Sequence, residues 1–336
     1  MGNHHTRAAT ILLAGILLPG LLGSGCGKGT GKEILTVYCA VDEPYASKIF
    51  ADFQKQTGIE IAPLYDIESS KSVGLSQKLI AEKDHPRADV WWGSEAFLTT
   101  RLADEGVLTP YDSPSAADIQ KQFKDPKGLW TGVGLRARVL AVGQPPPSFP
   151  ITSLADLTDP RLKDKICISL PTAGATGAHL SALYVVWGPD KARAFLHKLH
   201  DNGVKMLGGN AEVADQVGAG SYEVGLTDSD DVTNVQTNGG KLTAIVPDQD
   251  GEGTLAMPTT VALVNGTSHA AAAKKLIDFL LSKQAEQRLI DLGFAKWSVR
   301  AGPNGIKAID VDYRKAGEMF PVAEREGIAI LQGREP

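Results

Sequence analysis

Short apolar runs alternate with longer amphipathic segments along the first third of the chain. The runs typical of strands are residues 34–40, 59–64 and 88–92. The segments with helical spacing are residues 44–56, 73–82 and 95–105, and a glycine follows near the end of the first and the last of them. This alternation predicts a doubly wound α/β sheet.

The same alternation resumes after Trp130 and continues to residue 292. Strands are expected at residues 138–142, 166–170, 223–227, 242–246 and 260–264. Helices are expected at residues 179–187, 191–200, 212–218, 270–281 and 283–292, with a proline-rich loop at residues 144–150. The run at 260–264 carries no charge, which predicts a strand buried on both faces.

Two α/β halves in one chain predict two lobes, each with a doubly wound mixed sheet, around a ligand cleft. We expect one lobe from residues 33–135 with about 255–298, and the other from residues 136–254 with about 299–336. Ligands of open α/β sheets lie outside the carboxyl ends of the strands. The positions just after Cys39, Trp92, Leu170 and Leu226 are therefore the first candidates for a binding site.

The N-terminus differs from the rest of the chain. Arg7 is the only charged residue among the first 25, and an apolar run follows at residues 8–22. Small residues then lead to Cys26. A charged start, a short apolar run and a small-residue exit are typical of a signal peptide, which we place at residues 1–25. The run is short for a membrane span, and no second stretch of the sequence qualifies as one.

The segment Leu22-Gly23-Ser24-Gly25-Cys26 resembles a bacterial lipobox, in which the cysteine receives lipid. A large aliphatic residue usually lies three positions before the cysteine, and here that position is Gly23. We expect lipidation of Cys26, with residues 26–32 as a flexible tether at the membrane surface. The alternative is ordinary secretion with an incidental cysteine.

Composition and charge narrow the function further. The 336 residues include 43% hydrophobic and 22% charged residues, an ordinary soluble balance. The formal net charge is −5 and there is no basic run, so nucleic acid is not an expected partner. Cys39 and Cys167 both lie in apolar runs. They could pair after export, but a role as small buried residues is favoured.

Several motifs at the predicted strand ends resemble one family. They are VYCAVDE at 37–43, FQKQTGI at 53–59, ADVWWGSE at 88–95, WTG at 130–132, RARV at 136–139 and PTAGAT at 171–176. In this order and spacing, the chain resembles the ferric-iron-type extracellular solute-binding proteins of ABC importers, over about residues 34–297.

The resemblance implies a type II periplasmic-binding-protein fold that closes on its ligand by hinge motion. It also implies a monomer in the periplasm or at the outer face of the cytoplasmic membrane, with an ABC permease and an ATPase as partners. The chain has no Walker A sequence, so the energy for transport would come from those partners. A binding protein without catalytic activity or cofactor is expected, and any metal ion would be cargo.

The family's iron ligands imply where the ligand lies, and here the sequence departs from the pattern. Ferric-binding relatives carry two adjacent tyrosines after a strand that corresponds to residues 222–226, where this chain has Asp230 and Asp231. Carboxylates could bind a hard cation or an organic ammonium group. Together with Asp228 they could also form a solvated turn, because aspartate is common in turns.

The part of the family's site that binds an anion matches this sequence better than the iron ligands do. Backbone N–H groups and hydroxyls where a strand enters a helix suit a phosphate, phosphonate or carbonate. Arg136 and Arg138 match the family's basic pair, and strand alternation sends both side chains to one face. The remaining predicted contacts are Thr172, Gly174, Ala175, Thr176, Asn210, Asp42, Glu43 and Glu95. The simpler alternatives are an edge strand for the arginines and a helix cap for the threonines.

Two ligand classes follow from these residues, and other functions stay open. An anion subsite beside carboxylates suits an aminoalkylphosphonate-like zwitterion, whereas Asp230 and Asp231 with a bridging anion suit ferric iron or another metal. An exported metal-dependent hydrolase is an alternative, although Ser94 lacks a Gly-x-Ser-x-Gly setting and a histidine partner. A ligand sensor that docks on a receptor is the third possibility.

Overall fold

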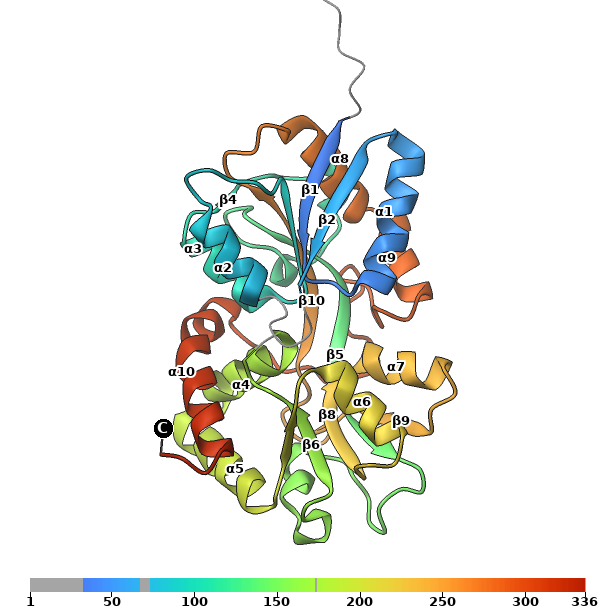
Figure 1. The fold of residues 1–336 in the computed structure, drawn as a ribbon, viewed down its shortest axis with the longest axis vertical. Helices are drawn as coiled ribbons and strands as arrows, with labels where there is room; N and C mark the ends of the chain where they lie inside the picture. The colour runs from blue at the N-terminus through green and yellow to red at the C-terminus, as the bar shows by residue number, and fades with distance from the viewer. Residues whose placement is uncertain (1–32, 67–72, 173, 336) are drawn as a thin grey trace, which may run out of the picture. The chain divides into compact units, whose positions relative to one another are not determined.

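The computed structural model describes residues 33–66, 73–172 and 174–335 (Figure 1). These residues form one compact unit. The predicted signal peptide at 1–25 and the tether at 26–32 with Cys26 lie outside the described residues. No helix of the described residues is long and apolar enough to span a bilayer.

The elements follow the predicted alternation of strands and helices. The strands are β1 (Ile34–Cys39), β2 (Glu60–Tyr65), β3 (Val90–Gly93), β4 (Leu108–Thr109), β5 (Thr131–Gly143), β6 (Ile166–Ser169), β7 (Lys205–Leu207), β8 (Val224–Asp228), β9 (Leu242–Ile245) and β10 (Ala256–Val264). The α-helices are α1 (Glu43–Thr57), α2 (Val73–Ala81), α3 (Ala96–Asp104), α4 (Gly174–Val186), α5 (Pro189–Asp201), α6 (Asn210–Gly218), α7 (Ser229–Thr237), α8 (Ala270–Leu280), α9 (Lys283–Asp291) and α10 (Tyr313–Leu331). Short 3-10 helices lie at Pro114–Ala116, Lys121–Phe123, Leu154–Thr158 and Pro160–Leu162.

The strands form a mixed sheet system in the order β2-β1-β3-β10-β5-β8-β6-β7, with β4 on β10 and β9 on β5. Strand β1 pairs in parallel with β2 and β3, and β6 pairs in parallel with β7 and β8. Antiparallel pairs of β10 with β3, of β10 with β5 and of β5 with β8 join these two parallel groups. The predicted α/β fold with mixed, doubly wound strands is confirmed.

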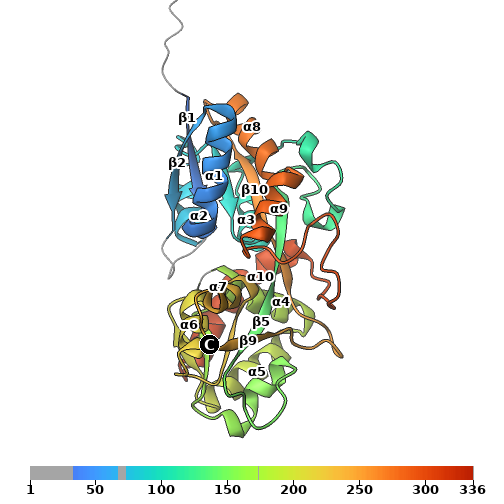
Figure 2. The same cartoon turned by 90° about the vertical axis from the view of Figure 1, so that its right-hand side faces the viewer.

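Strand β5 belongs to both groups of strands. Its first residues, from Thr131 to Ala137, pair with β10, and its last residues, from Arg138 to Gly143, pair with β8 and β9. All of its residues are buried. In Figures 1 and 2, β5 and β10 run between the group of helices α1, α8 and α9 and the group α4 to α7. Side chains on β5 can therefore contact both groups.

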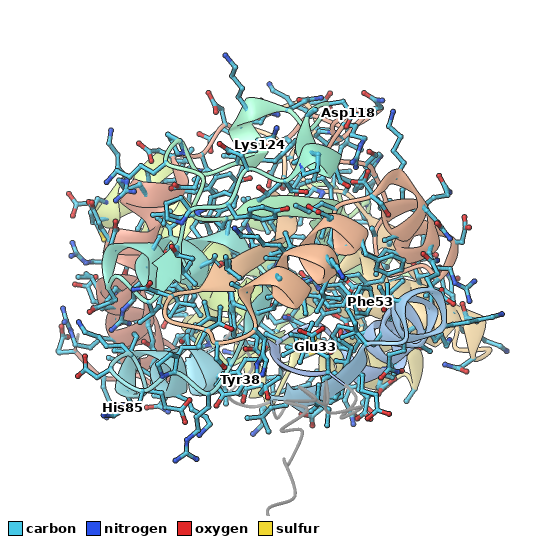
Figure 3. The ribbon with its side chains drawn as sticks, turned by 90° about the horizontal axis from the view of Figure 1, so that it is seen from above. Glu33, Tyr38, Phe53, His85, Asp118 and Lys124 are labelled. Carbon is cyan, nitrogen blue, oxygen red and sulfur yellow. The ribbon has the colours of Figure 1, made fainter. Side chains whose placement is uncertain are left out.

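Two large apolar clusters fill the two halves. One packs α1, α8 and α9 on β1, β3 and β5, and the other packs α4 and α5 on β6 and β8. In the first cluster, Phe53 of α1 (labelled in Figure 3) is buried. Its ring centroid lies 5.5 Å from that of Phe279 of α8. Cys39 and Cys167 are both buried, as their apolar surroundings predict. The residue boundaries expected for the two lobes stay a prediction.

Some elements differ from the sequence-based expectation. Helix α4 begins at Gly174 and not at residue 179. The sequence pattern did not predict its first turn because the residues there are buried and show no alternation of polar and apolar faces. Helix α7 begins directly after Asp228, in an aspartate-rich segment that also suited a turn. Helix α10 was not predicted; it contains Pro321 and packs on α3, α4 and α5.

The Glu286 carboxylate of α9 joins the segment after that helix to β5. Glu286 is only 2% exposed. It accepts hydrogen bonds from the backbone N–H groups of Gly134 (3.1 Å) and Val299 (2.8 Å). The Ser298 hydroxyl and the Arg300 guanidinium each donate to it at 2.6 Å. Four donors around one buried carboxylate satisfy its charge and fix the conformation of the chain that leaves α9.

Removing this carboxylate tests its contribution to stability. We expect Glu286→Ala to lower the free energy of unfolding by about 3–5 kcal/mol, because Arg300 and two backbone donors lose a buried partner. Urea unfolding followed by tryptophan fluorescence measures the change. The matched control is Glu223→Ala, whose pair with Lys165 is exposed (2.7 Å between Oε1 and Nζ), and there we expect a loss below about 1 kcal/mol. Equal losses for both variants would contradict this account.

Candidate functional site

Strands β5 and β8 and helix α7 bring their polar side chains together where β5 passes from one group of strands to the other. Arg136 and Arg138 lie on β5, and Asp228 ends β8 directly opposite Arg138 in the register. Helix α7 starts at the next residue and places Asp230 and Asp231 in its first turn. Acidic side chains in a first turn are favourable because the N-terminal end of a helix carries partial positive charge.

The centre of the site is a buried network of two arginines and two aspartates. The Asp228 carboxylate accepts a hydrogen bond from Arg138 Nη1 at 2.7 Å and from Arg136 Nη1 at 3.3 Å. Arg136 Nη1 also donates to Asp230 Oδ2 at 2.9 Å. Each of these four side chains is at most 3% exposed. Both guanidinium groups reach the same carboxylate, as their two-residue spacing on a strand predicts.

Arg138 also contacts the starts of α4 and α6. Its Nη1 donates to Asn210 Oδ1 at 3.0 Å, and its Nη2 donates to Thr176 Oγ1 at 3.2 Å. The Thr176 hydroxyl donates to the same Asn210 oxygen at 2.9 Å. The predicted site residues on β5, α4, α6 and β8 thus form one hydrogen-bonded group.

Asp231 lies at the more open side of this network. It is 9% exposed, against 2% for Asp228 and 1% for Asp230, and its Oδ2 accepts a hydrogen bond from Thr227 at 3.1 Å. One oxygen from each of the three carboxylates lies within 4.8 Å of the others. Three carboxylates against two guanidinium groups leave one formal negative charge in the network. The site therefore has chemistry suited to a cation.

Arg136 connects the network to the turn between β3 and α3 and to the segment after α9. Its Nη2 donates to the Ser94 carbonyl oxygen at 2.9 Å, in the turn between β3 and α3. Its guanidinium carbon lies 5.1 Å from the centre of the Phe294 ring, close enough for a cation–π contact. Burial opposes the charge on Arg136, but Asp230 and Asp228 outweigh it and raise its pKa. Arg136 is thus a permanent positive charge that contacts Asp228 and Asp230 on one side and Ser94 and Phe294 on the other.

Glu95 caps helix α3 beside Arg136. Its carboxylate accepts hydrogen bonds from the backbone N–H groups of Phe97 and Leu98, and the side chain is 1% exposed. Burial raises its pKa to about 7, against the lowering effect of those N–H groups and of Arg136. These hydrogen bonds are those of a helix cap, the function that an N-cap carboxylate commonly has.

The other predicted site residues lie around this network. Asp42 precedes α1 and its charge contributes to the raised pKa of Arg136, after Asp230 and Asp228. Glu43 is exposed in the first turn of α1. Thr172 lies before α4, and Gly174 and Ala175 are buried at the start of that helix.

Sequence reasoning missed several neighbours of the network. Ser94 contributes a carbonyl oxygen, and a backbone atom leaves no side-chain signal in a sequence. Phe294 comes from a segment far along the chain with no motif of its own. Buried His179 of α4 lies near Arg138, and burial followed by that positive charge lowers its pKa. Its position one turn after Thr176 on the same helix was the available signal.

The comparison with known families decides the class of protein. Residues 35–295 match the family described as bacterial extracellular solute-binding protein. The chain belongs to this family. As a solute-binding protein it is similar to the putative 2-aminoethylphosphonate-binding periplasmic protein of Salmonella typhi, at 27% identity over 78% of each chain. It is also similar to the iron uptake protein A1 of Synechocystis sp., at 24% identity over 76% of this chain and 73% of that protein.

A solved structure confirms the two-lobe fold of this solute-binding protein. The periplasmic binding protein AfuA from Actinobacillus pleuropneumoniae, with fructose-6-phosphate bound, superposes with a TM-score of 0.80 at 24% identity. The match covers 90% of this chain and 99% of that one. The predicted periplasmic-binding-protein fold is therefore confirmed. The predicted solute-binding role is confirmed by the family match.

The buried Glu95 carboxyl gives the solute-binding protein a specific pH dependence. Its pKa of about 7 in the folded protein lies above the ordinary value of 4.5, so the folded protein binds this proton more tightly than the unfolded chain. The stability gained from the proton is fully present below the ordinary pKa and is lost as the pH rises through about 7.

We therefore expect the stability of Glu95→Gln relative to the unchanged protein to rise by about 2 kcal/mol between about pH 5 and about pH 8. Urea unfolding at a series of pH values measures the difference. Glu105→Gln, an exposed glutamate at the other end of α3, is the control and should show no such trend. A pH-independent difference for Glu95→Gln would show that this carboxyl is already ionised at low pH.

Proposed function

We propose that this solute-binding protein captures a small zwitterion with a phosphonate group and an ammonium group, of the 2-aminoethylphosphonate type. It would deliver the ligand unchanged to an ABC permease with its ATPase. The observation that carries this proposal is the buried network itself, in which three aspartates and two arginines leave one negative charge beside the start of α4.

The ammonium half of the ligand would lie at the aspartates. Asp231 is the most exposed carboxylate of the cluster, and Asp42 lies close enough to affect Arg136. An ammonium group offers three donors and one positive charge, which match carboxylate oxygens and the remaining charge of the network. The arginines already hold Asp228 and Asp230 in place, so the acceptor geometry exists before the ligand arrives.

The phosphonate half would lie at the first turn of α4. Gly174 and Ala175 begin this helix, where backbone N–H groups have no partner within the helix. The Thr176 hydroxyl lies in the same turn and is held by Arg138. Thr172 adds a second hydroxyl just before the helix. Donor groups and the partial positive charge of the helix end suit an anion.

The relatives support this class of ligand and one rival. The Salmonella typhi relative is named for 2-aminoethylphosphonate binding, and the Synechocystis relative for iron uptake. The three clustered carboxylate oxygens favour a metal ion as the second candidate. Against iron, the family resemblance implies that Asp230 and Asp231 replace the two tyrosines of the ferric-type pattern. Arg136 and Arg138 also bind carboxylate oxygens that a metal would need.

Titration calorimetry on the ligand-free protein tests the two candidates. We expect 2-aminoethylphosphonate to bind with a Kd of about 1 μM or tighter, and ferric citrate to give no saturable signal. Asp231→Asn should weaken binding about 10- to 100-fold, because the ammonium loses a charged acceptor. The control is Asp215→Asn, an exposed aspartate on α6, which should bind normally. Tight binding of ferric iron without a response to 2-aminoethylphosphonate would refute the zwitterion.

We also propose that Cys26 is lipidated and that the monomer works in the periplasm at the outer face of the cytoplasmic membrane. A single lipid chain binds membranes weakly, so stable attachment needs the multiple acyl chains of a lipoprotein. Cys26→Ser should move the protein from the membrane fraction to the soluble fraction of fractionated cells, detected by immunoblot. Membrane attachment that survives this substitution would rule out the anchor.

A further inference from the structure

Tyr45 lies at the edge of the buried network. The sequence pattern did not predict it as a site residue. It occupies the first turn of α1, and its ring contacts that of Phe294 at a centroid distance of 5.1 Å. Phe294 in turn lies 5.1 Å from the guanidinium carbon of Arg136, whose Nη1 donates to Asp230. A continuous chain of contacts thus leads from Tyr45 to the aspartates of α7.

The Tyr45 hydroxyl is available to a ligand. The side chain is partly exposed, and no hydrogen bond of this hydroxyl is found among the described residues. Other tyrosines of the same half differ: the Tyr38 hydroxyl donates to Glu82 at 2.7 Å, and the Tyr111 hydroxyl donates to Asp278 at 2.9 Å. Tyr45 packs its ring against that of Phe294 at an interplanar angle of 44°, and its hydroxyl has no such partner among the described residues. This position is suited to a contact with solute.

The electrostatic surroundings of Tyr45 fit a cation and not an anion. Burial raises the pKa of its phenol, and the charges of Asp230, Asp231 and Asp42 raise it further. The charge of Arg136 acts in the opposite direction, but the pKa remains raised, so the phenol is neutral at ordinary pH. A neutral aromatic ring beside carboxylates attracts an organic ammonium through its face and its oxygen lone pairs.

We infer that Tyr45 determines the selectivity of the site for ammonium-bearing ligands, an inference that rests on the zwitterion proposed above. The ammonium lies between Tyr45 on α1 and Asp231 on α7, with Asp42 as a second acidic neighbour. Because α1 and α7 belong to the two different groups of elements around β5, the ammonium is contacted from both. Ligands that carry the phosphonate without the ammonium lose this contact and bind less tightly.

Two variants of Tyr45 and two ligands test the inference by calorimetry. The ligands are 2-aminoethylphosphonate and ethylphosphonate, which differ only in the ammonium group. Tyr45→Leu should weaken 2-aminoethylphosphonate about 10-fold and leave ethylphosphonate within about twofold, so the ratio of the two Kd values shrinks. Tyr45→Phe keeps the ring and should weaken 2-aminoethylphosphonate by about threefold. Tyr111→Phe is the matched control and should leave both Kd values unchanged.

The possible outcomes separate this inference from the proposal on which it rests. If the unchanged protein binds 2-aminoethylphosphonate and Tyr45→Leu leaves its affinity intact, or weakens both ligands equally, the inference is wrong and the proposed ligand class stands. If the unchanged protein does not bind 2-aminoethylphosphonate, both are wrong. Thermal unfolding of the ligand-free variants identifies a fold defect, which would lower the fraction of competent protein for both ligands equally.

Discussion

The Asp228 carboxylate and its two arginines are the interaction on which the site depends. Two buried guanidinium groups are costly to desolvate, and only well-placed carboxylates offset that cost. Strand β5 must therefore pair with β8 so that Arg138 lies opposite Asp228, and α7 must start at the next residue so that Asp230 reaches Arg136. The register of the sheet and the start of helix α7 are both needed to form this set of ion pairs, which sets the charge balance of the site.

The charge balance of this network differs from that of three carboxylates without arginine partners. Acidic residues that coordinate a metal need oxygens free of other partners, whereas here the arginines hold two of the three carboxylates at 2.7–3.3 Å. Such a network is rigid and already compensated, which reduces the cost of ordering it when a ligand binds. The one negative charge that remains matches the proposed singly charged organic cation better than a trivalent ion.

The alternation of apolar runs was enough to predict the α/β class, most strands and the two arginines on one face. The pairing of Arg138 with Asp228 could not be predicted, because it depends on the register between strands far apart in sequence. The role of Ser94 rests on a carbonyl oxygen, and those of Phe294 and Tyr45 on packing between distant segments. Helix α10 was missed because Pro321 and its glycines weaken the local helical signal.

The position of α10 has a consequence for how the chain reaches its folded state. Its residues Ala323, Ile330 and Leu331 complete the apolar cluster of α4 and α5, and Ala316 joins a further cluster with Phe97 of α3. Strand β10, also late in the chain, lies between β3 and β5. The apolar cluster of α4 and α5 is therefore complete only when α10 is available, and the β3 and β5 strands are joined only when β10 is available. Folding of this chain thus depends on contacts between segments that are far apart in the sequence, which slows the formation of a native core.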